Sequence, residues 1–526
     1  MATYNSFLIV GGFTLISRAL GFIRDILIAA VLGSGSIADA FFVAFKLPNL
    51  FRRLFGEGAL NAAFVPLFAS KIETRELDSA LEFAEDAISG LSIIMLILSV
   101  IAIISMPWLV FAFAPGFTSD PEKFELAVSL SRITFPYLLC MSLVAVMSGV
   151  LNTYGCFLLA SAAPISLNVV IILSLVFVLT LGFTNLVDVS FILATSITIA
   201  GMIQFVMLWC GIRNVGIKLK FRLPRYNENI KNLINLGIPS IISGGITQIN
   251  ILVGTIIASL QTGAVSFLYY ADRLYQLPLG VVGITISVVL LPDLSRKLRA
   301  GNVTEARKSQ NRSLEFALLL TIPASVALVI AADPIIFVLF ERGTFTAADT
   351  TATAQALVAF AIGLPAFVLI KVLQPAFFAR ENTATPMWFA VISMIANILG
   401  SLVLFYWFKT SKSWMPMPHV GIALATSIAG WTNMLLLWWK LAQTEAFYWD
   451  LRLVKNIMAI FCASFIMGGI LIFILPYVVK FFISSPFVIP RIIGLSIWVA
   501  TGVCVFFVII MLLGRFNMRQ MLQLKH

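Results

Sequence analysis

Histidine and cysteine are scarce in this chain, which has two histidines and five cysteines among 526 residues. His419 and His526 lie too far apart in the sequence to suggest a metal site. The cysteines are scattered among apolar segments without paired spacing. No GxxxxGK[ST] phosphate loop occurs, so the chain is not expected to hydrolyse ATP. We therefore predict no metal centre, no cofactor and no enzymatic activity.

Charged residues are also few. They make up 11% of the sequence, whereas hydrophobic residues make up 60% and mean hydropathy is +1.01. This composition excludes a soluble globular domain. Apolar stretches of about 20 residues or more recur along the whole chain, and each is long enough to cross a bilayer as an α-helix. The sequence therefore predicts an all-α polytopic membrane protein.

Fourteen membrane segments are predicted, and this even number places both termini on one side of the membrane. No Lys or Arg precedes the first apolar run and Arg18 shortens it, so a cleavable signal peptide is not expected. The approximate spans are 5–33, 37–70, 86–113, 124–152, 157–181, 188–212, 232–260, 264–294, 313–332, 347–378, 385–408, 419–440, 454–479 and 491–514.

Basic residues are distributed unevenly between alternate loops. The even-numbered connections and the C-terminal tail carry most of them, including Lys220 and Arg307, whereas the odd-numbered connections carry few, including Lys123 and Lys412. By the positive-inside rule, both termini and the even-numbered loops are predicted to be cytoplasmic. The net charge of +11 then reflects topology and a membrane site, and not nucleic-acid binding.

Charged side chains lie inside the first two membrane segments. A charge near the bilayer centre costs about 2.5 to 3.5 kcal/mol, so these groups are expected to face one another, water or a charged ligand. They are the leading candidates for a functional site. The first segment contains Arg18, Arg24 and Asp25, and the second contains Asp39, Lys46, Arg52, Arg53 and Glu57.

Helical periodicity leaves the arrangement of the first group open. In an ideal helix Arg18 and Asp25 share a face, whereas Arg24 is rotated away from Arg18. Gly21 lies between the two arginines and offers a place where the helix can bend or unwind. A broken helix would let all three charged side chains point inward.

The second group contains a choice between two adjacent arginines. In an ideal helix Arg53 shares a stripe with Asp39 and Glu57, and Arg52 lies on nearly the opposite side. Pro48 removes a backbone hydrogen bond and kinks the helix, so the residues after it need not keep this register. Periodicity alone does not choose between Arg52 and Arg53.

The alternative to a functional site is a set of salt bridges that lock the helices together, with long basic side chains snorkelling to the interface. The charges of the candidate cavity favour a ligand, because they leave a positive surplus that invites an anion. A planar guanidinium suits phosphate or carboxylate better than a point charge does. The basic members are Arg18, Arg24, Lys46, Arg52, Arg53 and Arg273, and the acidic ones are Asp25, Asp39, Glu57 and Asp272.

A short internal similarity suggests two halves. The second segment ends in PLFASK (66–71) and the eighth in PDLSRK (292–297), and the basic linker at 213–231 falls between the sixth and seventh segments. Two six-helix halves would share one orientation and be related by an axis along the membrane normal. The predicted parts are an N-lobe at 1–212, the cytoplasmic linker at 213–231, a C-lobe at 232–442, and two additional helices with a cytoplasmic tail at 443–526.

Several motifs make the chain resemble the MurJ (MviN) family of lipid II flippases. The N-terminal block is long enough to be highly specific, and the resemblance extends over the chain. The motifs are SRALGFIRD (17–25), DAFFVAFKLPNLFRR (39–53), EGA (57–59), ADRL (271–274) and PAFFAR (375–380).

The resemblance implies a protein of the bacterial inner membrane in the multidrug/oligosaccharidyl-lipid/polysaccharide exporter superfamily. Two six-helix lobes would surround a central cationic cavity, and two C-terminal helices would form a groove for a polyprenyl tail. The implied substrate is lipid II, a disaccharide peptide linked to undecaprenyl diphosphate, which is flipped from the inner to the outer leaflet by alternating access during peptidoglycan biosynthesis. Membrane lipids and the cell-wall synthesis machinery are the other implied partners.

Site residues follow from the matching motifs. The resemblance implies that the diphosphate contacts Arg18, Arg24, Arg52 and Arg273. It favours Arg52 over Arg53, and we follow it because Pro48 undermines the ideal-helix stripe. The implied supporting or switching residues are Ser17, Asp25, Asp39, Asn49, Arg53, Glu57 and Asp272.

Some members of the family look to have a sodium site with acidic ligands in the C-lobe. In this chain the seventh, eleventh and twelfth segments contain no Asp or Glu, and the weak candidates Asn250, Asn397 and Thr426 could equally bond between helices. An anion that leaves a negative interior gains roughly 2.3 kcal/mol per charge per 100 mV. We therefore expect the membrane potential to matter more than a sodium gradient.

Two other functions are weighed against flipping. A multidrug/cation antiporter of the same superfamily would be expected to have an acidic or aromatic cavity, and the positive surplus argues against it. A non-transporting membrane scaffold for cell-wall assembly has no reason to bury basic residues.

Overall fold

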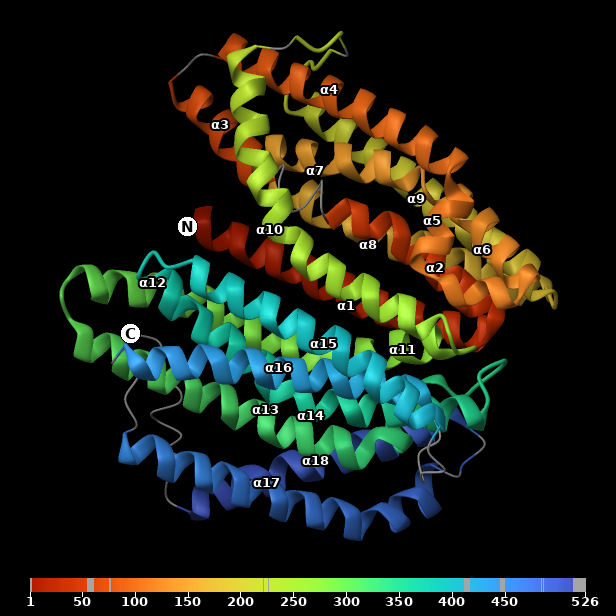
Figure 1. Ribbon diagram of the computed structural model, residues 1–526, viewed down its shortest axis with the longest axis vertical. Coiled ribbons are helices and arrows are strands. Elements are labelled where there is room, and N and C mark those ends of the chain that lie inside the picture. Colours follow the sequence, from red (N-terminus) through yellow and green to blue (C-terminus); the bar gives the residue numbers. More distant parts are fainter. Residues whose placement is uncertain are drawn as a thin grey trace. The chain divides into compact units, whose positions relative to one another are not determined.

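The computed structural model describes residues 2–53, 61–74, 77–220, 222–225, 227–410, 417–444, 450–483, 485 and 487–513. Within these ranges the chain forms eighteen α-helices and no β-strand, which confirms the all-α prediction (Figure 1). The elements are α1 (Ala2–Leu32), α2 (Ser36–Arg52), α3 (Asn61–Glu73), α4 (Leu77–Ile104), α5 (Met106–Phe113), the 3-10 helix η2 (Pro115–Ser119), α6 (Pro121–Thr134), α7 (Tyr137–Thr153), α8 (Phe157–Leu181), α9 (Leu186–Asn214), α10 (Glu228–Ala258), α11 (Ala264–Pro278), the π-helix η3 (Leu279–Gly283), α12 (Ile284–Arg299), α13 (Val303–Phe340), α14 (Ala347–Phe378), α15 (Ala384–Thr410), α16 (Pro418–Gln443), α17 (Leu451–Val478), the π-helix η4 (Val479–Ile483) and α18 (Val488–Leu512).

The helices are suited to a membrane by length and composition. In the described part of the chain, ten helical stretches are long and apolar enough to cross a bilayer. Their outer faces carry large exposed apolar side chains such as Ile101, Leu173 and Phe465, which a soluble protein would bury. The charged helices α1 and α2 are not among the ten, so the number fourteen stays a prediction.

Several predicted segments consist of two helices. The segment 86–113 is divided between α4 and α5, and Pro107 lies in the first turn of α5. The segment 124–152 likewise contains most of α6 and all but the last residue of α7, and Pro136 precedes α7. Proline lacks an amide hydrogen and is tolerated in a first helical turn, so it divides these segments without an unsatisfied donor.

Residue contacts divide the chain into two units. Unit 1 contains Met1–Ser266 and Arg342–Phe345, and unit 2 contains Phe267–Glu341 and Thr346–His526. Helix α10 packs against α3, α4 and α5, which places it in unit 1. The predicted lobes, which begin their second half at 232, rest on a sequence similarity and not on contacts. They stay a prediction.

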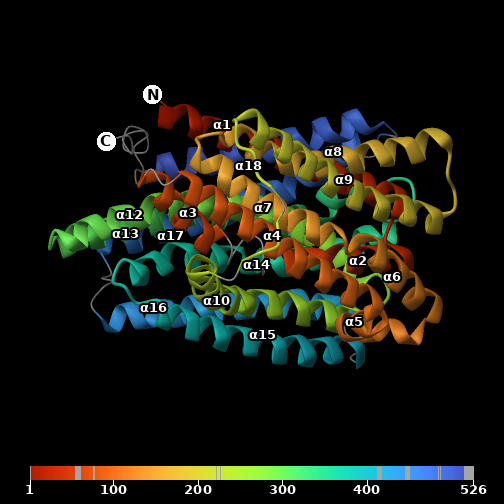
Figure 2. The ribbon, with the colours of Figure 1, turned by 90° about the horizontal axis from the view of Figure 1, so that it is seen from above.

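In unit 1, α7 is the central helix and packs against α3, α4, α8 and α9 (Figure 2). Helix α1 packs mainly on α8, and α2 packs on α6. The Thr134 hydroxyl of α6 donates to the carbonyl oxygen of Ala44 in α2 at 2.8 Å. The charged segments α1 and α2 are therefore held against different neighbours within this unit.

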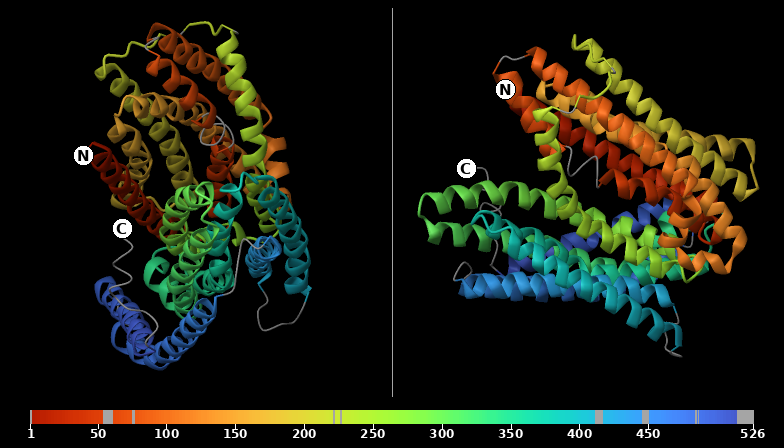
Figure 3. Two further views of the ribbon diagram at one scale, coloured as in Figure 1. Left: turned by 90° about the vertical axis from the view of Figure 1, so that its left-hand side faces the viewer. Right: turned by 45° about the horizontal axis from the view of Figure 1, so that its top comes forward.

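In unit 2, α14 is the central helix and packs between α13 and α16. Helix α15 lies beside α16, and α17 packs on α13 with α18 at its side (Figures 1 and 3). Gly468 permits the close approach of α17, because a Cβ atom there would lie 2.9 Å from side-chain atoms of Ile330 and Val326 in α13. The indole nitrogen of Trp498 donates to the carbonyl oxygen of Leu471 at 3.1 Å and fixes α18 on α17.

The basic linker between α9 and α10 is bound to α4. Arg222 Nε donates to Asp86 Oδ1 at 2.9 Å, and Asn227 Nδ2 donates to Asp86 Oδ2 at 3.1 Å. Desolvation acts to lower the pKa of Arg222, but the hydrogen bond to Asp86 and the charges of Glu85 and Glu82 outweigh it and raise this pKa. The linker is thus anchored on the surface of unit 1.

The topology prediction can be tested with single cysteines in a background that lacks the five native ones. Lys123 is only 4% exposed, so its exposed neighbour Glu122 is the better reporter, and Lys412 lies outside the described residues. We expect a membrane-impermeant thiol reagent to label Glu122→Cys in intact spheroplasts and Lys220→Cys only in inverted vesicles. The reverse pattern would contradict the predicted orientation.

Candidate functional site

Arg24 and Asp25 form a buried ion pair in α1, with 5% and 1% of their surfaces exposed. Arg24 Nε and Nη2 donate to Asp25 Oδ1 at 2.9 and 2.7 Å, and Nη1 donates to Oδ1 of Asn168 in α8 at 3.0 Å. The guanidinium carbon lies 5.4 Å from the ring centroid of Phe45 in α2. Groups on three helices therefore orient this guanidinium, and a cation–π contact adds to the charge-assisted bonds.

Asn168 also ties α8 to the backbone of α1. Its Nδ2 donates to the carbonyl oxygen of Ser17 at 3.0 Å. Gly21 lies beside this contact, and a Cβ atom at that position would lie at an ordinary van der Waals distance of 3.6 Å from the Asn168 side chain. Sequence reasoning did not single out Asn168, although a carboxamide inside the apolar α8 was the available signal.

Helix α1 is not broken at Gly21, the residue at which the sequence left a bend or an unwound turn open. The helix runs without interruption from Ala2 to Leu32. Arg18 is exposed, whereas Arg24 and Asp25 are buried, so the continuous helix does not turn all three side chains inward. Among the described residues, the Arg18 side chain makes no hydrogen bond or ion pair. Within unit 1, Arg18 is thus the more accessible of these two arginines.

Asp39 lies at the start of α2 and is completely buried. Its Oδ2 accepts hydrogen bonds from Lys123 Nζ at 2.8 Å and from the Gly263 amide at 2.7 Å. Its Oδ1 accepts from the amide and the hydroxyl of Ser266 at 3.0 and 2.7 Å. A buried carboxylate needs both a counter-charge and hydrogen-bond donors, and this one has both.

The Asp39 carboxylate also caps α11, because Gly263 and Ser266 lie at the amino end of that helix. Negative charge is favourable at a helix N-terminus, where amide groups point outward. Unit 1 ends at Ser266 and unit 2 begins at Phe267 in the same helix. Asp39 therefore holds the segment in which the chain passes from one unit to the next.

Lys123 is the charge partner that the sequence interpretation missed. The residue was counted as an external loop charge, but it lies in the first turn of α6, and its ammonium group is 4.1 Å from the ring centroid of the buried Phe117. Asp120 caps the same turn by accepting from the Lys123 amide at 3.1 Å. The cap and the aromatic ring direct the Lys123 side chain toward Asp39.

Two other loops of unit 1 are held by hydrogen bonds from their backbone amides. The Gly116 amide donates to the Ser259 hydroxyl at 3.0 Å, and a Cβ atom at 116 would lie 2.3 Å from the Ser259 carbonyl oxygen. The Thr344 amide donates to the carbonyl oxygen of Ala30 at 3.0 Å. All of these residues, like Asp39 and Gly263, lie in or beside odd-numbered connections, which are predicted to face outward.

The carboxyl end of α2 carries the paired arginines. Arg52 is half-buried and its Nε donates to Asn49 Oδ1 at 3.2 Å, while Arg53 is exposed. The side-chain Nδ2 of Asn49 in turn donates to the carbonyl oxygen of Phe45 at 2.7 Å. Lys46 is partly buried in the same helix. Glu57 lies outside the described residues.

In unit 2, Arg273 is partly buried in α11. Its Nη2 donates to the hydroxyl of Tyr269 at 2.8 Å, and its guanidinium carbon lies 4.6 Å from the Tyr269 ring centroid. The adjacent Asp272 accepts a hydrogen bond from Gln276 one turn later. Tyr269 therefore positions Arg273 within its own unit, much as Asn168 and Phe45 position Arg24 in unit 1.

Two of the weak sodium candidates lie together in unit 2. Asn397 Oδ1 accepts hydrogen bonds from the hydroxyls of Thr426 and Ser401, both at 3.3 Å. Asn250 belongs to α10 in unit 1. No group of three or more His, Cys, Asp or Glu residues in the described part of the chain could hold a metal ion. The bond from Thr426 joins α16 to α15, whereas the bond from Ser401 lies within α15.

The matching family model and two relatives of this chain are all described as lipid II flippases. The family model described as lipid II flippase MurJ matches residues 28–490. A probable lipid II flippase MurJ of Rhizobium tropici is 45% identical over 475 residues, which cover 90% of this chain and 87% of that protein. A probable lipid II flippase MurJ of Rhizobium meliloti (strain 1021) is 47% identical over 472 residues, which cover 90% of this chain and 86% of that protein.

Solved structures are similar as well. A lipid II flippase MurJ in an inward closed conformation matches with a TM-score of 0.76 and 28% identity, over 95% of this chain and 98% of that chain. An inward-facing multidrug resistance MATE family transporter of the MOP superfamily matches with a TM-score of 0.64 and 17% identity, over 82% of this chain and 95% of that chain. The second likeness shows the fold alone. The resemblance drawn from the sequence motifs is confirmed, and the chain belongs to the lipid II flippase MurJ family.

Proposed function

We propose that this multi-pass protein of the bacterial inner membrane moves lipid II from the inner to the outer leaflet by alternating access, without covalent chemistry. The observation that carries the proposal is the buried and oriented guanidinium of Arg24 inside an apolar helix bundle. A planar guanidinium binds diphosphate oxygens through paired hydrogen bonds. Membership of the family supplies the identity of the anion.

The diphosphate is bound by Arg18, Arg24, Arg52 and Arg273. Asp25 holds the Arg24 guanidinium until the substrate arrives, and phosphate oxygens then compete with its carboxylate for the same N–H groups. Ser17, Asn49, Arg53, Glu57 and Asp272 have supporting roles. The exposed Arg18 makes the first contact, because its charge is the most accessible one in α1.

Asp39 acts in the conformational change and does not bind substrate. Its carboxylate joins α2 to α6 and to the start of α11 at the end of unit 1 that is predicted to face outward. Release of the substrate to the outer leaflet requires these bonds to break and to form again when the transporter resets. The contacts of Gly116 with Ser259 and of Thr344 with Ala30 belong to the same outer closure.

Both termini are cytoplasmic in this proposal, and the cell-wall synthesis machinery takes up the exported lipid II. Multidrug/cation antiport is disfavoured by the arginine-rich site, because a cationic drug would be repelled. A non-transporting scaffold is disfavoured because it does not need a positioned guanidinium inside its helix bundle.

The substrate-binding arginines give the first functional prediction. Replacement of any one of these arginines by alanine should leave membrane insertion at a normal level. It should abolish lipid II translocation in proteoliposomes, because a lost charge-assisted contact costs about 1.5 to 3 kcal/mol. Arg296→Ala, whose side chain is 80% exposed at the end of α12, is the matched control and should remain active. The variants are Arg18→Ala, Arg24→Ala, Arg52→Ala and Arg273→Ala.

The same translocation assay can separate the effect of the Arg24 charge from the effect of its orientation. Asn168→Leu leaves the Arg24 charge in place but removes one of the bonds that orient it, so translocation should fall by about tenfold and not vanish. Ser174→Ala removes another polar contact of α8, the 2.6 Å bond to Ser196, and is expected to have little effect. Full activity of all four arginine variants would sink the assignment of the site.

The Asp39–Lys123 pair predicts a strong coupling. Lys123→Met leaves a buried and uncompensated carboxylate, which should cost about 3 to 5 kcal/mol and lower the unfolding temperature of the purified protein. The double variant with Asp39→Asn should be more stable than Lys123→Met alone, because it removes the stranded charge. Glu122→Gln, at the exposed neighbouring position, is the control. Additive effects of the two substitutions would contradict the pairing.

The third functional prediction concerns energy. A loaded site is nearly neutral because bound phosphates offset its surplus positive charge, and the empty carrier returns with positive charge toward the negative interior. Translocation in vesicles should therefore rise with a potential set by potassium and valinomycin and should respond little to sodium at fixed potential. Dependence on sodium with indifference to the potential would refute this mechanism.

A further inference from the structure

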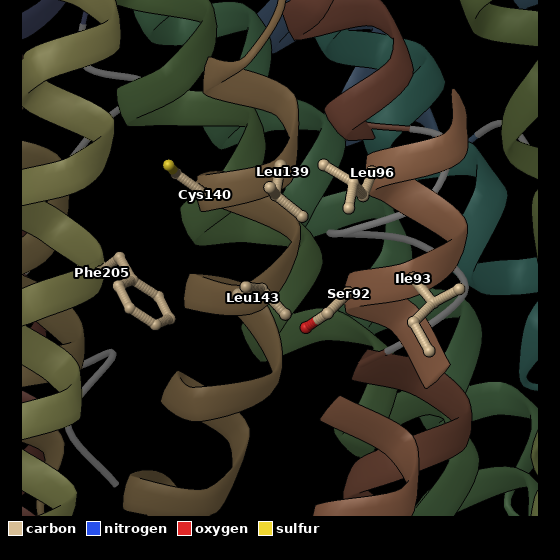
Figure 4. A pocket seen from close by; sticks show the side chains of 7 residues that line it. All are labelled: Ser92, Ile93, Leu96, Leu139, Cys140, Leu143 and Phe205. Carbon is tan, nitrogen blue, oxygen red and sulfur yellow. The ribbon is translucent and has the colours of Figure 1, made fainter. Parts of the chain in front are cut away.

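An apolar groove of about 330 Å³ lies on unit 1, apart from the charged site (Figure 4). Helix α7 forms its floor with Cys140 and Leu143, and α4 and α9 form its walls. The wall residues Ile93 and Leu96 are 39% and 52% exposed, so the groove opens to the outer surface of the helices. On this surface the groove faces the hydrocarbon of a bilayer.

An aromatic and basic stripe leads out of the groove along α9. Phe205, which lines the groove, stacks on Trp209 with ring centroids 6.0 Å apart and an interplanar angle of 25°. The guanidinium carbon of Arg213 lies 5.5 Å from the Trp209 ring centroid. The three residues are spaced four apart on one helix face and span about 12 Å. Trp beside a basic residue is typical of the boundary between hydrocarbon and headgroups.

The basic linker contacts α4 next to the groove. The Arg222 amide donates to the Ser89 hydroxyl at 3.2 Å, one turn before the groove residue Ile93. Leu223 in this linker is 84% exposed, as expected for a side chain that enters the membrane surface. Lys218, Lys220 and Arg225 are also exposed in the linker. A cluster of exposed positive charge therefore accompanies this end of the groove.

We propose that this groove binds an anionic phospholipid of the surrounding bilayer. One acyl chain occupies the groove beside Phe205, the glycerol region lies at Trp209, and the phosphate group bonds to the edge of the Arg213 guanidinium. A guanidinium stacked on an indole keeps its N–H edges directed outward, which suits this contact. The Ser92 hydroxyl, the polar side chain of the groove, already donates to the Ile88 carbonyl oxygen at 2.7 Å, so the groove suits hydrocarbon and not a peptide backbone.

Charge complementarity favours an anionic lipid over a zwitterionic one. A basic residue near the membrane surface contributes about 1 kcal/mol to the attraction of an anionic headgroup, which corresponds to about fivefold in binding. The site does not depend on translocation of lipid II. It holds a lipid of the inner leaflet if the linker is cytoplasmic as predicted.

The proposal can be tested by quenching of Trp209 fluorescence with brominated phospholipids in vesicles that contain the full chain. The Trp209 signal is the difference between the wild-type protein and Trp209→Phe. We expect brominated phosphatidylglycerol to quench this signal at about a fivefold lower mole fraction than brominated phosphatidylcholine. Arg213→Gln should remove the preference, whereas Arg296→Gln, which removes one exposed charge of unit 2, should leave it unchanged.

Filling the groove provides the second arm. Cys140→Phe should reduce quenching of Trp209 by brominated acyl chains of both lipids, because the chain can no longer enter. Equal quenching by the two lipids in the wild-type protein would overturn the proposal. Displacement of brominated phosphatidylglycerol by equimolar lipid II would also overturn it, since the occupant would then be the tail of the transported substrate. Neither measurement requires flipping, so failure here is distinct from failure of the proposed function.

Discussion

The end of unit 1 that is predicted to face outward depends on one interaction, the buried carboxylate of Asp39. A charge with no exposed surface inside an apolar bundle is tolerated only when a counter-charge and donors surround it, and here they come from α6 and from the start of α11. The packing of α2 on α6 and the first residues of α11 are therefore linked through one side chain. Such a junction is strong while it is complete, yet it consists of few bonds and can be released as a unit.

Arg24 is likewise a buried charge that needs partners, but its partners are of a different kind from those of Asp39. Its partner Asp25 is its neighbour in the same helix, and Asn168 and Phe45 also contact its guanidinium. None of these contacts closes a loop or caps a helix, which supports the proposal that an anion replaces Asp25 as the partner of Arg24. Asp39 therefore suits a switch between conformations, whereas Arg24 suits a substrate contact. Arg273 stands in a comparable position in unit 2, where Tyr269 orients it.

The basic residues that are predicted to be cytoplasmic have more than one role. Positive charge in even-numbered loops is explained by topology alone, and the sequence interpretation used it in that way. The structure adds individual partners, because Arg222 binds the acidic cluster of α4 and Arg213 covers Trp209. Arg222 and Arg213 count equally in the positive-inside rule, but they contact different groups. In the described part of the chain, only Arg222 of these two forms an ion pair with carboxylates.

The sequence by itself determined the class of protein and the family, because composition and motifs are properties of the chain alone. The all-α fold and the family resemblance are both confirmed. Tertiary structure decided the partners. Periodicity along α1 placed Arg18 and Arg24 on different faces, but it could not show that Asn168 of α8 packs beside Gly21 and bonds to Arg24 in an unbroken helix. Loop counting assigned Lys123 to the exterior, and only the packing of α6 on α2 revealed its bond to Asp39. A sequence pattern shows which face of a helix a side chain occupies, whereas burial and pairing depend on which other helix is packed against that face.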